Sequence, residues 1–370
     1  MIKLAYICSS TSWGGLEMNQ WRNALWMKER GHKVVIFALK DSPIYKKAES
    51  SSIPVVEIKK HRKYYDFGAS FQLIKLLKRE NVSHLIVRDT RDMSISAMAK
   101  FWSFGFHFHL SYFMEMQLGV QKTNWLHTLR FSQFDLWSCP LAWLQSQVLS
   151  KTRFDFNKTI IIPSALDLSP FQSVSKNNEN QIEARNLLNL PANKTIVGLI
   201  GRFDPQKGQV LLLEALNSCI NKEVCVCLLG EPTLGEGTTY YERIEKTIED
   251  YQLHDRVFIR PFREDIASFY KAIDAFVMAS KAETFGMVTI EAMASGVPTI
   301  GSNAGGTPEI LEYGKLGFLF QPLDALSLAK SIDEFLNNRD LISPNLLMET
   351  AKKYDQQVVC AAVESALNLQ

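Results

Sequence analysis

The sequence predicts an α/β protein made of two Rossmann-like domains, each with a doubly wound parallel sheet. The prediction rests on the length of 370 residues, on short apolar runs that alternate with amphipathic stretches, and on a proline-containing connector near the middle. With 46% hydrophobic and 22% charged residues, the chain is long enough to form two domains that each bury a core. A disordered chain is therefore not expected.

The first domain is predicted from short apolar runs at residues 4–7, 34–39 and 85–87, which have the length of buried strands. Helical patterns at residues 17–30 and 71–80 lie between these runs. Buried strands that alternate with helices indicate a parallel sheet covered by helices on both faces.

A second series of apolar runs predicts the sheet of the second domain. These runs lie at residues 195–200, 224–229, 257–259, 275–278 and 299–300. The two series together indicate two doubly wound domains.

The boundary between the domains is expected after Pro163, where a predicted strand is followed by small and polar residues. We therefore assign residues 1–165 to the first domain and residues 166–350 to the second, with a polar linker at residues 173–180. The C-terminal helical stretch, about residues 350–370, either packs on the second domain or completes the first.

Cysteine usage and hydropathy are typical of a reduced, intracellular protein. The cysteines are scattered, mostly in apolar runs, without Cys-x-x-Cys spacing or a nearby histidine cluster: Cys8, Cys139, Cys219, Cys225, Cys227 and Cys360. We interpret them as reduced core residues and expect no zinc site. No run of about 18 or more uncharged apolar residues is present, and the first residues resemble a buried strand, not a signal peptide. We expect a cytoplasmic location, including the inner face of a membrane.

Charge is distributed unequally between the two halves, although the net charge is only +2. Residues 1–165 carry 23 Lys and Arg against 12 Asp and Glu, whereas residues 166–370 carry 18 against 27. A basic first half suits an anionic partner, such as a membrane surface or a phosphorylated acceptor. A solvated basic face explains the asymmetry equally well. Nucleic acid is not an expected partner, because no nucleic-acid-binding motif accompanies the charge.

A glycine-flanked loop follows the predicted strand at residues 196–200. It runs from Gly201 to Gly208 and contains Arg202 and Lys207. A glycine at the end of a strand lets the backbone turn close to a ligand, and two cations can neutralise a diphosphate. Taken alone, the motif also fits an ordinary strand-to-helix turn with two surface cations.

Two glutamates flank the predicted start of a helix near Gly286. Glu283 lies in the loop before this helix, and Glu291 lies on its early turns. The unpaired N–H groups at the start of a helix favour an anion. Each carboxylate can accept hydrogen bonds from a pair of hydroxyls, on a donor sugar for Glu283 and on ribose for Glu291. A glycosidase pair of acid and nucleophile is the alternative, but it leaves the phosphate-binding features without a purpose.

Glycine pairs follow two other predicted strands. Residues 305–306 permit a close approach of the backbone, and Thr307 and Glu309 are expected to cap the next helix. Gly14 and Gly15 open a helix in the first domain and can direct N–H groups at a diphosphate. One glycine pair before a helix is common, so the second motif is weak by itself.

Together these motifs resemble the retaining glycosyltransferases of family 4, which have the GT-B fold of two Rossmann-like domains facing a central cleft. The resemblance is carried in order by residues 201–208, 283–291 and 305–309. Over the first half it rests on residues 14–17 and on the general order of strands, which discriminate less.

The resemblance implies a nucleotide-diphosphate sugar as donor, retention of anomeric configuration, and no metal ion or other cofactor. It assigns Arg202 and Lys207 to the leaving diphosphate, Glu283 to the donor sugar and Glu291 to the ribose. The implied catalytic residues are Glu283, Lys207 and Arg202. The implied donor-binding residues are Gly14, Gly15, Gly201, Phe285, Gly286, Met287, Val288 and Glu291.

The chain departs from the family pattern in two places. Where many relatives carry Pro-Asn-Gly-Val-Asp at the connector, this chain has Pro163-Ser-Ala-Leu-Asp167. The histidine that often contacts the donor sugar corresponds to His107, His109 or His127. The first two also fit polar positions of a strand.

Acceptor-binding residues are expected where strands of the first domain end. Arg88 and Arg91 follow the strand at residues 85–87, Glu115 follows the next strand, and His109 is a further candidate. A salt-bridged loop and a partly buried strand explain these residues equally well.

Two stretches of the first domain suit contact with anionic lipid and a lipid-linked acceptor. Residues 59–65 combine basic and aromatic side chains, and residues 101–106 are aromatic. The aromatic side chains fit a hydrophobic core equally well.

The favoured function is transfer of a sugar to a glycan, lipid-linked or other glycoconjugate acceptor in cell-surface polysaccharide or lipopolysaccharide biosynthesis. A nucleotide-sugar epimerase of similar fold is the first alternative, but its set of catalytic carboxylates and a histidine is not found. A non-catalytic nucleotide-binding protein is the second alternative. Such a protein does not need the four charged residues of the motifs together, which are Arg202, Lys207, Glu283 and Glu291. Whether the base is uridine, guanosine or adenosine does not follow from the sequence.

Overall fold

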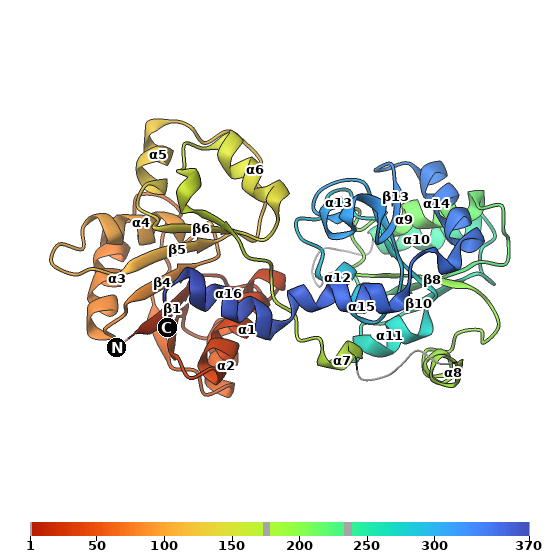
Figure 1. Ribbon diagram of the computed structural model, residues 1–370, viewed down its shortest axis with the longest axis horizontal. Helices are drawn as coiled ribbons and strands as arrows, with labels where there is room; N and C mark the ends of the chain where they lie inside the picture. Colours follow the sequence, from red (N-terminus) through yellow and green to blue (C-terminus); the bar gives the residue numbers. More distant parts are fainter. Residues whose placement is uncertain (1, 173–177, 233–238, 370) are drawn as a thin grey trace. The chain divides into compact units, whose positions relative to one another are not determined.

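The computed structural model describes residues 2–172, 178–232 and 239–369. The chain forms two compact units, shown in Figure 1. The first unit comprises residues 1–165 and 356–370, and the second comprises residues 166–355. Each unit is an α/β domain, as predicted.

In the described part of the first unit, seven parallel strands form one sheet in the order β3-β2-β1-β4-β5-β6-β7. The strands are β1 (Lys3–Cys8), β2 (Lys33–Leu39), β3 (Val55–Ile58), β4 (His84–Val87), β5 (His109–Phe113), β6 (Leu136–Cys139) and β7 (Thr159–Ile161). The apolar runs predicted as strands in this domain are confirmed.

Helices cover both faces of this sheet (Figure 1). They are α1 (Gly15–Glu29), α2 (Pro43–Ser50), α3 (Phe67–Arg79), α4 (Met93–Phe101), α5 (Trp125–Phe131), α6 (Ala142–Lys151) and α16 (Gln356–Ala366), with the 3-10 turn η1 (Phe156–Lys158). Successive residues of β1 point to opposite faces. Leu4 and Tyr6 pack with α1, α2 and α16, whereas Ala5 and Ile7 pack with α3 and α4. The C-terminal helix therefore completes one helical layer of the first unit.

In the described part of the second unit, six parallel strands form a sheet in the order β10-β9-β8-β11-β12-β13. The strands are β8 (Ile196–Ile200), β9 (Cys225–Leu229), β10 (Val257–Arg260), β11 (Ala275–Met278), β12 (Thr299–Ser302) and β13 (Gly317–Phe320). The five predicted runs are confirmed as strands, and β13, which was not predicted, is one of the two edge strands.

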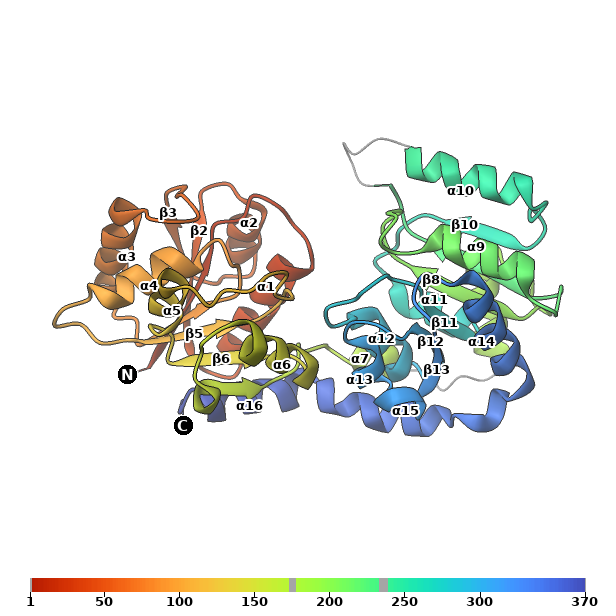
Figure 2. The ribbon, with the colours of Figure 1, turned by 90° about the horizontal axis from the view of Figure 1, so that it is seen from above.

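Figure 2 shows the helices of the second unit around this sheet. They are α7 (Ser169–Gln172), α8 (Asn178–Leu187), α9 (Gln209–Ser218), α10 (Thr239–Asp250), α11 (Ile266–Ala272), α12 (Met287–Ala294), α13 (Thr307–Ile310), α14 (Ala325–Asn337) and α15 (Pro344–Ala351), with the 3-10 turns η2 (Glu312–Gly314), η3 (Arg339–Leu341) and η4 (Lys352–Tyr354). Of the linker predicted at residues 173–180, residues 173–177 lie outside the described residues. Residues 178–180 begin α8, so the prediction of a linker is wrong there.

Each sheet has one topological switch point. In the first unit the chain moves outward in opposite directions from β1 and β4, and in the second unit from β8 and β11. The loops that follow these neighbouring strands diverge at the carboxyl edge of the sheet, where open α/β sheets bind ligands. Of the glycine-containing loops singled out in the sequence, those with Gly14, Gly201 and Gly286 follow β1, β8 and β11, and the one with Gly305 and Gly306 follows β12.

The cysteines are free and buried, as predicted from their apolar surroundings. Among the residues that the structure describes, no helix has both the length and the apolar character needed to cross a membrane.

Candidate functional site

The switch point of the second unit holds a pair of opposite charges. Lys207 lies in the loop after β8 and Glu283 in the loop after β11, and Lys207 Nζ is 3.0 Å from Glu283 Oε2. The two side chains are 33% and 22% exposed. The pair therefore joins the two loops while both groups remain accessible to a ligand.

The loop that carries Lys207 is fixed from both ends. Asp204 forms a turn in which its side chain accepts from the N–H of Gln206 and its carbonyl accepts from the N–H of Lys207. Gly208 then begins α9 with a left-handed φ of 78°. A Cβ at Gly208 would lie 2.5 Å from the carbonyl oxygen of Ala279, so only glycine lets the two loops pack this closely.

The loop that carries Glu283 is held by the glycine pair at 305–306. The N–H of Gly306 donates to the carbonyl of Glu283 at 2.8 Å. Gly305 has a φ of 65°, and a Cβ there would lie 2.2 Å from the same carbonyl oxygen. The close approach expected at this pair is therefore an approach to the backbone of Glu283.

The capping prediction beside this pair is wrong. The residue that caps α13 is Gly306, which has no side chain to accept a hydrogen bond. Thr307 and Glu309 instead lie in the first turn, and Thr307 is buried.

Helix α12 starts beside Glu283. Its N-cap is Gly286, with a left-handed φ of 89°, and a Cβ there would lie 3.3 Å from Glu283 Cγ. No side chain caps this helix start, and no acidic residue lies in its first turn. The N–H groups of Met287 and Val288 lie at the positive end of the helix dipole, which favours an anion.

Glu291 is held inside the second unit and is not a solvated surface side chain. It is only 7% exposed, and the Tyr270 hydroxyl lies 2.9 Å from Glu291 Oε2. Burial, together with the nearby charge of Glu291, raises the pKa of Tyr270 well above its ordinary value. The phenol therefore stays protonated and can donate to the carboxylate.

Of the other donor-site candidates, Gly201 and Arg202 lie in the same loop as Lys207, whereas Phe285 is buried. Gly201 lies against Lys207, since a Cβ at Gly201 would be 3.6 Å from Lys207 Cδ. Arg202 is exposed in the same loop, and its carbonyl accepts from Gln209 Nε2 at 2.8 Å. Phe285 is buried and packs edge-on against Tyr354, with ring centroids 5.8 Å apart. The Phe285 side chain therefore stabilises the loop by packing in the interior of the unit.

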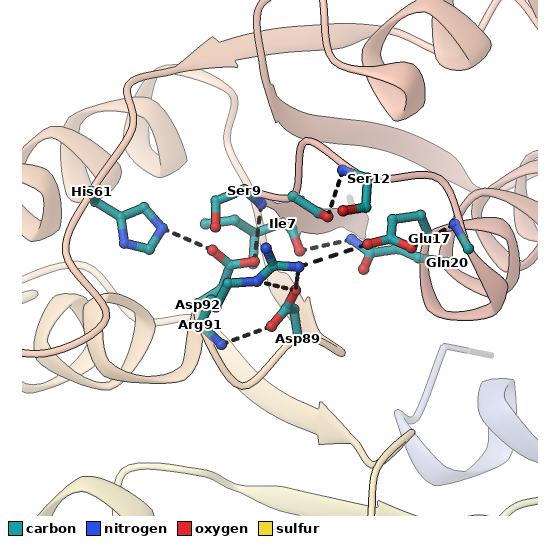
Figure 3. A network of polar contacts seen from close by, with 11 residues as sticks. Ile7, Ser9, Ser12, Glu17, Gln20, His61, Asp89, Arg91 and Asp92 are labelled. Atoms are coloured by element: carbon teal, nitrogen blue, oxygen red, sulfur yellow. Dashed lines mark hydrogen bonds and ion pairs between the residues drawn. The ribbon is translucent and has the colours of Figure 1, made fainter. Parts of the chain in front are cut away.

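The switch point of the first unit holds a larger polar network, shown in Figure 3. Asp92 is fully buried after β4 and accepts a hydrogen bond from the N–H of Ser9, which follows β1. His61 Nε2 lies 2.8 Å from Asp92 Oδ1, and the His61 side chain is only 2% exposed. Burial is the largest single effect and lowers the pKa of His61, but the hydrogen bonds to Asp92 and to the Arg62 carbonyl and the charges of Asp92 and Asp66 together outweigh it, so the pKa is raised overall.

Arg91 connects two further carboxylates in this network (Figure 3). Its Nη2 lies 2.5 Å from Asp89 Oδ2 and 3.7 Å from Glu17 Oε1. Glu17 also accepts from the N–H of Gly14 at 2.9 Å. Of the pair expected to bind a diphosphate, Gly14 thus donates to a carboxylate of its own helix, whereas Gly15 is exposed.

Arg88 and Glu115 form a buried ion pair across the ends of β4 and β5. Asn19 Nδ2 donates to Glu115 at 3.3 Å, and the Arg88 guanidinium lies over the Phe113 ring at 5.1 Å. Burial raises the pKa of Glu115, and Arg88 partly opposes this shift. Of the acceptor candidates, Arg91 is 44% exposed, whereas Arg88 and Glu115 face inward.

The candidate histidines lie apart. His109 is the first residue of β5, and its ring is 5.3 Å from that of His84, the first residue of β4. Because both strands are parallel, His109 lies at the amino edge of the sheet, opposite Arg88 and Glu115. We therefore remove it from the acceptor site.

The other two histidines have different surroundings. His107 is exposed and precedes β5, so its interpretation as a strand position is wrong. His127 lies in α5 and stacks on Phe131, with ring centroids 5.7 Å apart. His61 was missed, because a histidine within a basic run gives no signal of burial.

Residues 180–355 match the family model described as glycosyl transferases group 1. This part of the chain is therefore similar to that family. The matched residues include the loops that carry Lys207 and Glu283 and the whole of α12. The family resemblance drawn from the motifs is therefore confirmed.

Curated relatives share about 30% identity with part of the chain. The D-inositol 3-phosphate glycosyltransferase of Streptomyces scabiei is 29% identical over 195 residues, which are 50% of this chain and 43% of that protein. The protein of the same description from Corynebacterium kroppenstedtii is 30% identical over 187 residues, 49% of this chain and 41% of its own. The chain thus spans less than half the length of these relatives in the matches.

Solved structures share the fold of the whole chain. HepE of Anabaena in complex with UDP is 21% identical with a TM-score of 0.86, and each chain is covered completely. A glycosyltransferase from Rickettsia africae is 17% identical with a TM-score of 0.86, covering 100% of this chain and 99% of its own. The two parallel-sheet units therefore have the GT-B fold, as predicted from the motifs.

Proposed function

We propose that this chain is a retaining glycosyltransferase that moves a sugar from a nucleotide-diphosphate sugar to a glycan, lipid-linked or other glycoconjugate acceptor. The observation that carries the proposal is the accessible Lys207–Glu283 pair at the switch point of the second unit, within the segment that matches the family model. Solved structures of HepE contain UDP, UDP and glucose, or UDP-glucose, which supports a sugar nucleotide as donor.

The leaving diphosphate is proposed to bind between Lys207, Arg202 and the start of α12. Two cations and the backbone N–H groups of Met287 and Val288 supply positive charge from two loops that are fixed by glycines. Charge that is already in place stabilises a leaving anion without reorganisation during the reaction. In this proposal the protein itself supplies the charge that a metal ion would otherwise provide.

Donor binding is proposed to exchange the partners of the ion pair. The diphosphate competes with Glu283 for the Lys207 ammonium, and the released carboxylate then accepts hydrogen bonds from hydroxyls of the donor sugar. Glu291 is proposed to accept from the ribose hydroxyls while Tyr270 orients its carboxylate. Partial exposure of Lys207 and Glu283 makes this exchange physically accessible.

The reaction is proposed to proceed on one face of the sugar. A bond forms between the acceptor oxygen and the anomeric carbon while the bond from that carbon to the phosphate oxygen breaks. The acceptor proton passes to the leaving phosphate, so the anomeric configuration is retained. Positioning and preorganised charge supply most of the acceleration.

The first unit is proposed to bind the acceptor at its own switch point. Arg91 is the exposed cation there, and the buried Arg88–Glu115 pair positions the ends of β4 and β5. We place the reaction in cell-surface polysaccharide or lipopolysaccharide biosynthesis, at the cytoplasmic side of a membrane.

The test begins with thermal unfolding in the presence of UDP, GDP or ADP, because a ligand of the folded state raises the midpoint. The matching sugar nucleotides are then assayed for hydrolysis and transfer. Glu283→Gln is expected to abolish transfer while the protein stays folded, and Glu334→Gln, at an exposed position of α14, serves as the matched control. No midpoint shift with any nucleotide, or full transfer by Glu283→Gln, contradicts the proposal.

A further inference from the structure

The first unit contains an apolar pocket that the proposed chemistry does not use. It has a volume of about 500 Å³ and is lined by the connection between β3 and α3, by α4, and by α5 with its flanks. On α4 the lining residues Ser94, Ala97, Met98 and Phe101 repeat at helical spacing, so one face of the helix forms a wall. The volume lies in the range of ligand sites.

Aromatic side chains dominate the opening of this pocket. Tyr65, Phe67, Phe101 and Trp125 are each more than half exposed, and Leu129 is 47% exposed. A contiguous exposed apolar surface of this kind marks a binding site. The aromatic residues at positions 101–106 were expected either to contact lipid or to fill a hydrophobic core. Phe101 and Phe104 are exposed, so these two do not belong to the core.

Cations border the same pocket. Arg130 lines it, donates from Nη1 to Ser94 Oγ at 3.1 Å, and lies over the Tyr64 ring at 5.4 Å. The pKa of Lys122 is lowered by burial and then by the positive charges of Arg130 and Lys63, so the three cations lie within electrostatic reach. In the described part of the chain, no ion pair joins any of them to a carboxylate. Together they favour an anion.

The cationic part of the pocket is next to the polar network of Figure 3. Ser94, which accepts from Arg130, lies in the first turn of α4. Asp92, the residue before this helix, is bound to Ser9 and His61 in the network. One molecule can therefore place a polar group near the switch point and an apolar chain along α4.

We propose that this pocket holds the hydrocarbon chain of a phosphate-linked lipid acceptor, with the phosphate beside Arg130 and Lys122. The inference rests on the proposed transferase function and specifies its acceptor. A soluble glycan has no apolar group for a pocket of this size, and a neutral lipid has no charge for three cations. An anionic single-chain amphiphile satisfies both features.

The test measures binding of dodecyl phosphate below its micelle-forming concentration, without any sugar nucleotide. A bromine atom on the terminal carbon is expected to quench the fluorescence of Trp102 and Trp125, which line the pocket. Each buried methylene contributes about fourfold in affinity, so octyl phosphate, which is four methylenes shorter, is expected to bind roughly 250-fold more weakly. A neutral dodecyl maltoside is expected to bind severalfold more weakly than dodecyl phosphate.

Two pairs of variants locate the site. Leu129→Asp introduces a carboxylate at the pocket and is expected to weaken binding at least tenfold, whereas Phe156→Asp, on the exposed turn η1, is expected to leave it unchanged. Lys122→Gln is expected to weaken binding severalfold, with Lys75→Gln on the exposed face of α3 as its control. Circular dichroism confirms that each variant is folded.

The inference is overturned if the affinity does not depend on the length of the alkyl chain, or if it is equal in Leu129→Asp and Phe156→Asp. Equal binding of dodecyl phosphate and dodecyl maltoside overturns the assignment of a phosphate-linked lipid. The result is independent of catalysis, because the binding assay contains no donor. If UDP stabilises the protein and dodecyl phosphate does not bind, the proposed lipid site is wrong and the proposed transferase function is unaffected. If dodecyl phosphate binds and no nucleotide stabilises the protein, the proposed transferase function is wrong and the lipid site is unaffected.

Discussion

The two switch points have the same place in their sheets and different electrostatic character. In the second unit, one cation and one carboxylate form a partly exposed pair, Lys207 with Glu283. In the first unit, three carboxylates surround Arg91 and His61, and all three are buried. In the proposed function a diphosphate replaces Glu283 as the partner of Lys207, whereas the carboxylates of the first unit would repel it. The comparison teaches that strand order creates two candidate sites and that charge decides which of them suits the donor.

The largest effect is expected from Lys207→Ala. Loss of the ammonium removes a preorganised charge from the leaving group, which typically costs about 10²- to 10³-fold in kcat. Lys330→Ala, at an exposed position of α14, is the matched control and is expected to keep full activity. Steady-state transfer kinetics measure the effect. A near-normal kcat/KM in Lys207→Ala would contradict the assignment of the donor site to the switch point of the second unit.

Matched glycine substitutions compare the packing of the two switch points. Gly305→Ala forces a Cβ against the Glu283 carbonyl at a positive φ, and the strain is expected to cost about 1–3 kcal/mol. A thermal midpoint several degrees lower follows for a domain of this size. Gly15→Ala is the control, because nothing lies within 4 Å of a Cβ there. Equal midpoints for both variants would show that the contact at Glu283 relaxes freely.

The buried His61–Asp92 contact is expected to make the first switch point sensitive to pH. His61→Gln removes a hydrogen bond to a charged group, which is expected to cost about 1–3 kcal/mol when His61 is protonated. The folded-state pKa of His61 is raised. Its stabilisation is therefore complete below the unfolded value of about 6.5 and is lost as pH rises through the folded value. The midpoint difference from wild type should be larger at pH 5.5 than at pH 8.5, and a difference that grows with pH contradicts this assignment.

The smallest effect is expected at Glu364, which holds α16 against α1. Its carboxylate accepts from Arg30 Nε at 2.8 Å and lies 2.7 Å from His32 Nε2. The hydrogen bond from Arg30 is the main cause that lowers the pKa of Glu364 to about 2. Its stabilisation is present above the unfolded value of about 4.3 and is lost as pH falls towards 2.

Glu364→Gln is therefore expected to cost about 1 kcal/mol at pH 7, and the difference from wild type should shrink between pH 4.5 and 2. Urea unfolding followed by circular dichroism measures it. Glu349→Gln, whose contact with Lys352 is exposed, is the control. A difference that stays constant with pH would show that Glu364 is not ionised in its contact with Arg30.

Local sequence determined the elements of both sheets and the position of the loops that matter. Apolar runs such as residues 34–39 and 275–278 became strands with nearly the expected bounds, because a buried strand needs a continuous apolar stretch. Glycines at 208 and 286 marked the starts of helices, since both positions have a positive φ. The family motifs also lie in short segments, so they were visible without a fold.

Only the tertiary structure decided which of these segments meet. Lys207 and Glu283 are 76 residues apart, and they pair because β8 and β11 are neighbours. His61 is buried on Asp92 although it lies in a basic run, and His109 lies at the amino edge because β5 begins there. Likewise, Cys360 and Val363 place α16 on the first unit by filling its core. Local periodicity encodes which face of an element is buried, but strand order and long-range packing fix its partners.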